Sequence, residues 1–103
     1  MLAELEIVPL GTQSASLSAL LAEVVQRIDA SGLDYRVGPM GTVVEGEWDQ
    51  IMRLVKQCHE AMLQSASRVM TTIRIDDRKD KPGPRIVQKV QSLEQATGRS
   101  LKR

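Results

Sequence analysis

The chain begins with residues whose apolar and polar character alternates, which predicts a half-buried strand over residues 2–8. Its two faces would carry Ala3, Leu5 and Ile7 on one side, and Glu4 and Glu6 on the other. Pro9 follows directly and has no N–H to donate, so we expect the strand to end there.

Two later stretches carry apolar residues at helical spacing. The first extends from Leu17 to Ile28, and Gly32 after it suits a left-handed C-terminal cap. The second begins near Glu47, where acidic residues suit the helix dipole. Its predicted apolar stripe is Trp48, Ile51, Met52, Val55, Cys58 and Met62.

Three further strands and a last helix complete the pattern. The strands are predicted over residues 33–37, 42–45 and 68–76, with the turn cluster Gly38-Pro39-Met40-Gly41 between the first two. Pro84 suits the start of a third helix, which Gly98 would end.

The predicted fold class is therefore α+β, a ferredoxin-like βαββαβ sandwich with a C-terminal helix added. It has a four-stranded antiparallel sheet with two helices on one face, and residues 1–103 form one domain. The other sheet face would mix apolar and charged side chains, which favours self-association over a plain solvated face with local cross-strand pairs. That face would comprise Leu2, Glu4, Glu6, Val8, Arg36, Met70, Thr72 and Arg74.

Composition excludes several classes of function. The net charge of +1 gives no long-range attraction to nucleic acid, and the strands lack the aromatic residues of RNA-binding sheets. A single cysteine, Cys58, and a single histidine, His59, offer no disulfide and no metal site, and the glycines form no phosphate-binding motif of a cofactor site. No apolar run reaches the roughly 20 residues of a membrane helix, and no secretory signal is visible. We therefore expect a cytoplasmic protein.

The two aromatic residues of the chain, Tyr35 and Trp48, flank Glu45. Aromatic rings mostly serve packing, but rings gathered around a carboxylate also suit a flat cationic heterocycle with amino groups. Glu45 would need either such a ligand or Arg36 as its partner. The predicted ligand-binding residues are Pro9, Thr12, Tyr35, Gly38, Thr42, Glu45 and Trp48.

The run YRVGPMGTVVEGEWDQIM and the strand RVMTTIRIDDR resemble the thiamine-binding-protein-like family of small ferredoxin-like proteins. The matching positions are Gly38, Pro39, Thr42, Glu45 and Gly46. The resemblance implies a protein that forms dimers or tetramers and binds thiamine or its pyrimidine part without catalysis, as a carrier or a sensor. Two alternatives stay open: a regulatory module that senses another small ligand such as an amino acid, and a small enzyme that uses Glu45 as a base.

Overall fold

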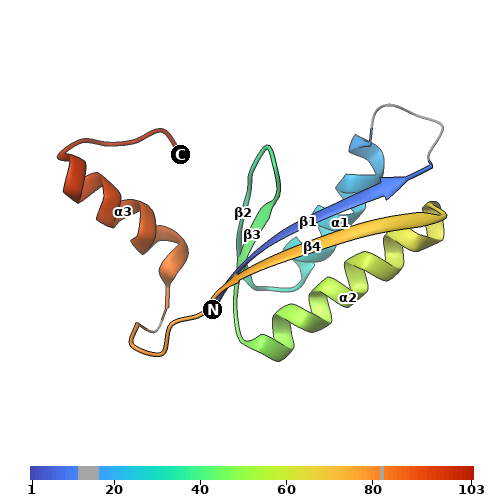
Figure 1. Ribbon diagram of the computed structural model, residues 1–103, viewed down its shortest axis with the longest axis horizontal. Helices are drawn as coiled ribbons and strands as arrows, with labels where there is room; N and C mark the ends of the chain where they lie inside the picture. Colours follow the sequence, from blue (N-terminus) through green and yellow to red (C-terminus); the bar gives the residue numbers. More distant parts are fainter. Residues whose placement is uncertain (12–16, 82) are drawn as a thin grey trace.

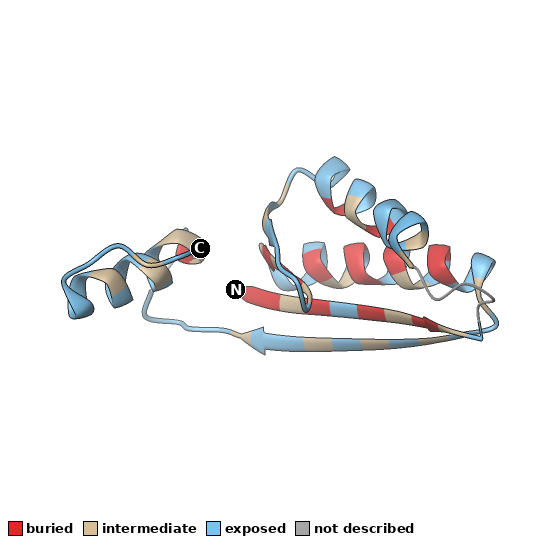
Figure 2. Ribbon diagram, turned by 90° about the horizontal axis from the view of Figure 1, so that it is seen from above, coloured by how far each residue is buried: buried red, intermediate tan, exposed pale blue. Residues whose placement is uncertain are grey.

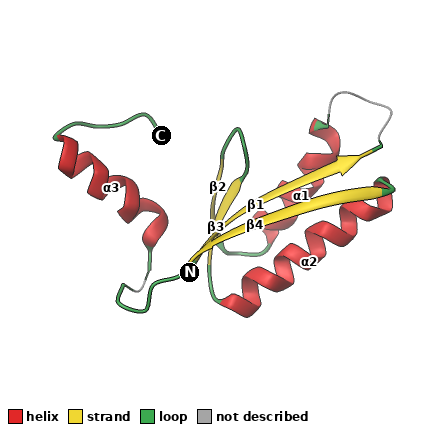
Figure 3. Cartoon of the chain, in the orientation of Figure 1, coloured by secondary structure: helices red, strands yellow, loops and turns green. Residues whose placement is uncertain are grey.

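The computed structural model describes residues 1–11, 17–81 and 83–103. Strands and helices follow one another in the predicted order (Figures 1 and 3). The elements are β1 (Leu2–Leu10), α1 (Ser18–Ala30), β2 (Asp34–Val37), β3 (Thr42–Glu45), α2 (Trp48–Ser65), β4 (Arg68–Asp76) and α3 (Arg85–Thr97). Residues 12–16, which include Thr12 of the predicted site, and residue 82 lie outside the described part.

The strands form one antiparallel sheet in the order β2-β3-β1-β4 within the described chain. Helices α1 and α2 lie together on one face of this sheet (Figure 2). The predicted ferredoxin-like α+β fold is confirmed. Gly32 has the left-handed conformation expected of it, with φ +78° after the end of α1.

The core lies between the sheet and these two helices. Its buried side chains come from alternate positions of β1, from Val44 of β3 and from the inner stripes of α1 and α2. Cys58 belongs to this core, and burial raises the pKa of its thiol. Among the best-buried members are Ala3, Leu5, Val24, Ile28, Val44, Ile51, Leu54, Cys58 and Met62.

Strand β1 is longer than predicted, because Pro9 does not end it. Pro9 is buried and lies opposite Val69 of β4, and the pairing continues to Leu10. Of the residues of β1, only Leu2–Leu5 pair with β3 in the described structure. Beyond Leu5 the strand therefore has a free edge, where a residue without an N–H is tolerated.

The start of α2 also differs from the prediction. Glu47 and Gln50 form a capping box, which fixes the first turn. Trp48, predicted as part of the apolar stripe, is instead 56% exposed. Its position in the first turn places it beyond the end of the sheet, so the core residues of α2 begin at Ile51.

The third helix, α3, projects from one end of the sheet instead of covering a face (Figures 1 and 2). The radius of gyration is 15.2 Å, whereas a compact chain of this length would have about 13 Å. Arg85 is the single buried residue of this helix among those described. No described helix combines the length and apolar character needed to cross a membrane.

Candidate functional site

The carboxylate of Glu45 binds the N-terminus of α3. Its Oε1 and Oε2 atoms accept the backbone N–H of Arg85 at 2.9 and 2.8 Å, and Oε1 also accepts that of Ile86 at 3.1 Å. A carboxylate at this position satisfies amides that have no partner inside the helix and complements the helix dipole. Glu45 is thus a cap supplied from 40 residues away in sequence, a role that local pattern could not reveal.

Asp76, at the end of β4, binds two side chains of the same helix. It accepts hydrogen bonds from Lys89 at 2.5 Å and from the buried Arg85 at 3.3 Å. The hydrogen bond from Lys89, followed by that from Arg85, lowers the pKa of Asp76 to about 2. The backbone approaches closely here: a Cβ on Gly83 would overlap the Glu45 carboxylate.

The other residues predicted around Glu45 lie apart from its carboxylate. Tyr35 donates its hydroxyl to Asp29 of α1 at 2.7 Å, and this bond raises the pKa of Tyr35. Arg36, proposed as the alternative partner of Glu45, donates to the backbone oxygen of Tyr35 at 2.9 Å. Trp48 is exposed at the start of α2. The Glu45 carboxylate is therefore satisfied by the amides of α3, and neither predicted partner, Arg36 or a ligand, is needed to balance it.

The predicted site residues lie at two ends of the sheet. In β3, Thr42 pairs with Leu5 of β1, whereas Glu45 pairs with Leu2. At about 3.3 Å per residue, the three steps between them span roughly 10 Å. Gly38 lies at the Thr42 end and Trp48 at the Glu45 end, so one chain does not bring all of these residues into one site.

A pocket of about 320 Å³ lies at the Thr42 end, between α1, the middle of β1 and the turn between β2 and β3. We call it the turn pocket. It contains Gly38 and Thr42 of the predicted site, and Pro9 directly follows its lining residue Val8. The lining comprises Leu5, Glu6, Ile7, Val8, Leu17, Leu21, Val24, Val25, Ile28, Val37, Gly38, Pro39, Met40, Gly41 and Thr42.

The polar groups of the turn pocket are few. Glu6 is the one ionisable side chain in its described lining, and Thr42 supplies a buried hydroxyl. The turn is closed by a hydrogen bond from the N–H of Gly38 to the oxygen of Gly41, at 2.8 Å. Beyond Leu5, the free edge of β1 also presents backbone donors and acceptors, because alternate residues of a strand point their polar groups to each edge.

Sequence reasoning missed the walls of this pocket. The apolar stripe of α1 supplies the buried core residues Val24 and Ile28, but Leu21 of the same helix is 36% exposed and lines the pocket. Glu6, exposed between the buried Leu5 and Ile7 as the alternation predicts, also lines the pocket. The available signal was Pro9, which marks an unpaired edge of β1, but its position relative to β3 depends on register. Thr12 lies outside the described residues.

Comparison with known proteins gives the family. Residues 3–94 match the family model described as thiamine-binding protein. A UPF0045 protein of Methanothermobacter thermautotrophicus is 48% identical over 80 residues, which cover 76% of this chain and 81% of that protein. The UPF0045 protein YqgV of Bacillus subtilis is 40% identical over 85 residues, 78% of this chain and 82% of that protein.

Two solved structures share the fold. The hypothetical protein MJ1052 of Methanocaldococcus jannaschii has a TM-score of 0.82 and 34% identity, covering 89% of this chain and 93% of that one. A candidate thiamine biosynthesis/salvage protein of Thermotoga maritima has a TM-score of 0.77 and 28% identity, covering 89% and 96%. Matched over most of its length by the family model and by these relatives, the chain belongs to the thiamine-binding protein family.

Proposed function

We propose that this protein binds thiamine or a related aminopyrimidine in the turn pocket, without catalysis, as a cytoplasmic carrier or sensor. The observation that carries the proposal is the charge of the described lining, where the exposed Glu6 is the one ionisable side chain beside mostly apolar groups. A single carboxylate in an apolar pocket favours a cationic ligand with a flat body. The volume of about 320 Å³ is at the small end of the range for ligand pockets, about 300–1,000 Å³.

The other groups of the pocket complement an aminopyrimidine. Its ring nitrogens and amino group need alternating donors and acceptors, and a free strand edge supplies both from the backbone. The Thr42 hydroxyl can donate or accept a hydrogen bond. Glu6 is left to pair with the positive charge of the ligand. Family membership supports the ligand class, because the matching family is described as thiamine-binding.

The position of Glu45 supports binding over catalysis. An enzyme that used Glu45 as a base would need its carboxylate free to take a proton, but both oxygens accept backbone amides of α3. The pocket itself contains no second ionisable group in its described lining to pair with Glu6 as acid and base.

A thermal-shift screen tests the proposal against the amino-acid sensor alternative. The ligands are thiamine, its phosphates, its pyrimidine precursor and a set of amino acids. A ligand at 100 times its dissociation constant stabilises the fold by about 2.7 kcal/mol, which is readily visible as a raised melting temperature. We expect thiamine or the pyrimidine to act, and Glu6→Gln to reduce the shift while Glu60→Gln, on the outer face of α2, does not. A shift with amino acids alone would favour the sensor.

We also propose that the protein self-associates through the part of the sheet that α1 and α2 leave uncovered. Met70 is 54% exposed there, on the same face of β4 as Arg74, which pairs with Glu4 at 2.9 Å across the β1–β4 boundary. An exposed apolar residue beside paired charges of both signs suits a self-complementary contact between copies.

A further inference from the structure

We propose that the outer edge of β4 pairs with the same edge of a second copy, so that two sheets join side by side. β4 ends the sheet order β2-β3-β1-β4, and β1 pairs with it along its whole length, Arg68–Asp76. In the described structure the other edge of β4 therefore presents a row of backbone N–H and C=O groups that no strand pairs with. This edge is a different surface from the sheet face proposed above as a contact, so both contacts can form at once.

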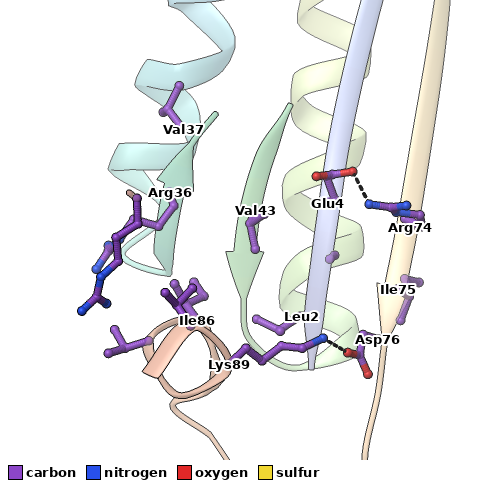
Figure 4. A pocket seen from close by; sticks show the side chains of 14 residues that line it. Leu2, Glu4, Arg36, Val37, Val43, Arg74, Ile75, Asp76, Ile86 and Lys89 are labelled. Atoms are coloured by element: carbon purple, nitrogen blue, oxygen red, sulfur yellow. Dashed lines mark hydrogen bonds and ion pairs between the residues drawn. The ribbon is translucent and has the colours of Figure 1, made fainter. Parts of the chain in front are cut away.

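The side chains beside this edge are poorly covered. Ala3 of β1 belongs to the core and is 1% exposed, whereas Ile75, which pairs with it and shares its face of the sheet, is 39% exposed. None of the nine residues of β4 is buried. Helix α3 does not cover this edge, because it packs mainly against β2 and β3 toward the opposite edge of the sheet (Figure 4). A strand from a second copy would cover the apolar surface that β4 leaves open.

β4 lacks the features that keep edge strands unpaired. Edge strands of monomeric proteins are usually very short, or carry a proline, a bulge or an inward-pointing charge. β4 has nine residues without a proline, and its register with β1 runs one to one with no bulge, whereas β2 at the other edge has four residues. The helix-facing side chains of β4 are all uncharged: Val69, Thr71, Ile73 and Ile75.

The sequence of β4 is self-complementary when two copies run antiparallel about Thr72. Arg68 of one copy then lies opposite Asp76 of the other at each end of the pair, and the two Thr72 residues face each other at its centre. Opposite charges and Thr–Thr pairs across neighbouring strands stabilise a sheet. Asp76 also binds Lys89, but its side chain is still 41% exposed and a carboxylate has about four acceptor positions. The remaining opposite pairs are Val69 with Ile75, Met70 with Arg74, and Thr71 with Ile73.

The neighbouring registers are less favourable. Opposite residues must share a face of the sheet, so the pairing can slip only by two residues at a time. A slip of this size in one direction places Arg68 opposite Arg74, and like charges directly opposite each other destabilise a pair of strands. The slip in the other direction leaves Arg68 unpaired and brings Asp76 opposite Met70. The register about Thr72 pairs the whole strand and joins opposite charges at both ends.

Cysteine cross-linking tests the edge and the register together. Directly opposite residues of an antiparallel pair have Cα atoms about 4.5–5.5 Å apart, which suits a disulfide. Val69 and Ile75 would lie opposite each other only between copies, since along one strand they are roughly 20 Å apart. Their side chains point toward the helices, so a contact between uncovered sheet faces cannot bring them together. The double variant Val69→Cys/Ile75→Cys should therefore form a covalent dimer on mild oxidation.

The two single variants are the matched controls. In the paired copies, Val69→Cys alone places its two thiols roughly 20 Å apart, and Ile75→Cys does the same. A pair held together has an effective concentration of about millimolar, so at micromolar protein the double variant should cross-link at least about a hundredfold faster than either single variant. Cys58 is buried, so the wild type should give no covalent dimer. Melting curves should show every variant folded, and the reduced double variant should sediment like the wild type.

Three outcomes would overturn the proposal. No cross-link in the double variant, while sedimentation shows an oligomer, would leave the uncovered sheet face as the contact between copies. Equal cross-linking of the double and single variants would mean random collision. A wild type that sediments as a monomer of 11.4 kDa would contradict both the edge pairing and the face contact.

Discussion

Glu45 accepts the backbone N–H of Arg85 with both carboxylate oxygens, at 2.9 and 2.8 Å, and so fastens the third helix to the end of β3. The carboxylate that the sequence marks as a ligand group serves here as a helix cap. Glu45 and Asp76 thus connect the sheet to the projecting helix α3.

Replacement of Glu45 by Gln should loosen α3 and leave the turn pocket intact. The neutral amide keeps one acceptor but loses the charge that strengthens hydrogen bonds to the helix amides. Loss of a cap corresponds to about 0.5–2 kcal/mol. Hydrogen exchange should therefore show faster exchange in α3, while thiamine affinity stays that of the wild type.

The matched control for this change is Glu60→Gln. Glu60 pairs with Lys56 on the exposed side of α2 at 3.8 Å, where an ion pair contributes little. If Glu45→Gln instead weakened thiamine binding and left the exchange of α3 unchanged, Glu45 would be a ligand group after all.

Acid should release α3 before it unfolds the core. Because the folded-state pKa of Asp76 is lowered to about 2, its contribution to stability is present above its ordinary pKa of 3.8 and is lost as pH falls through 2. Amide exchange or helicity of α3, followed from pH 5 down to pH 2, should show this loss mainly below pH 4. In Asp76→Asn the same region should be loosened already at neutral pH, with little further change on acidification.

Cys58 should be unreactive in the native protein. The thiol is buried, and burial raises its pKa, so little thiolate exists at neutral pH to attack a reagent. Labelling with a thiol reagent should proceed only as fast as the core opens and should become rapid in denaturant. Fast labelling under native conditions would show that α2 does not pack on the sheet as described.

Met70→Lys should shift the protein toward a monomer of 11.4 kDa. Met70 projects from the uncovered sheet face, and a charge there opposes apolar contact between copies. Sedimentation at micromolar concentration measures the mass. Leu63→Lys, which changes an exposed residue of α2 in the same way, should leave the mass unaltered; a monomeric wild type would contradict the proposed self-association.

Local pattern predicted most of the fold. The predicted bounds 68–76 match those of β4, and its residues alternate between exposed and partly buried from Arg68 to Arg74. It could not predict that Pro9 continues β1, since this depends on where β3 stops pairing. Nor could it find the partner of Glu45, because the contact with Arg85 joins residues 40 apart and forms only once α3 has docked.

The candidate site was predictable only in part. The turn was recognisable by its glycines between two predicted strands, and Thr42 by its hydroxyl at the start of the second of them. The turn pocket is also lined by α1, and local sequence does not show that this helix packs beside β1. Tyr35 and Trp48 attract attention as the two aromatic residues, yet one binds Asp29 and the other is exposed.

The most direct test of the central claim is titration calorimetry of thiamine against the wild type, Thr42→Val and Trp48→Ala. Val has nearly the shape of Thr but lacks the hydroxyl, so we expect affinity to fall by about 0.5–1.5 kcal/mol, the contribution of one hydrogen bond. Trp48, at the other end of β3, serves as the control and should not change it. Loss of affinity in Trp48→Ala with none in Thr42→Val would place the site elsewhere, and no binding to the wild type at millimolar thiamine would contradict the proposed function itself.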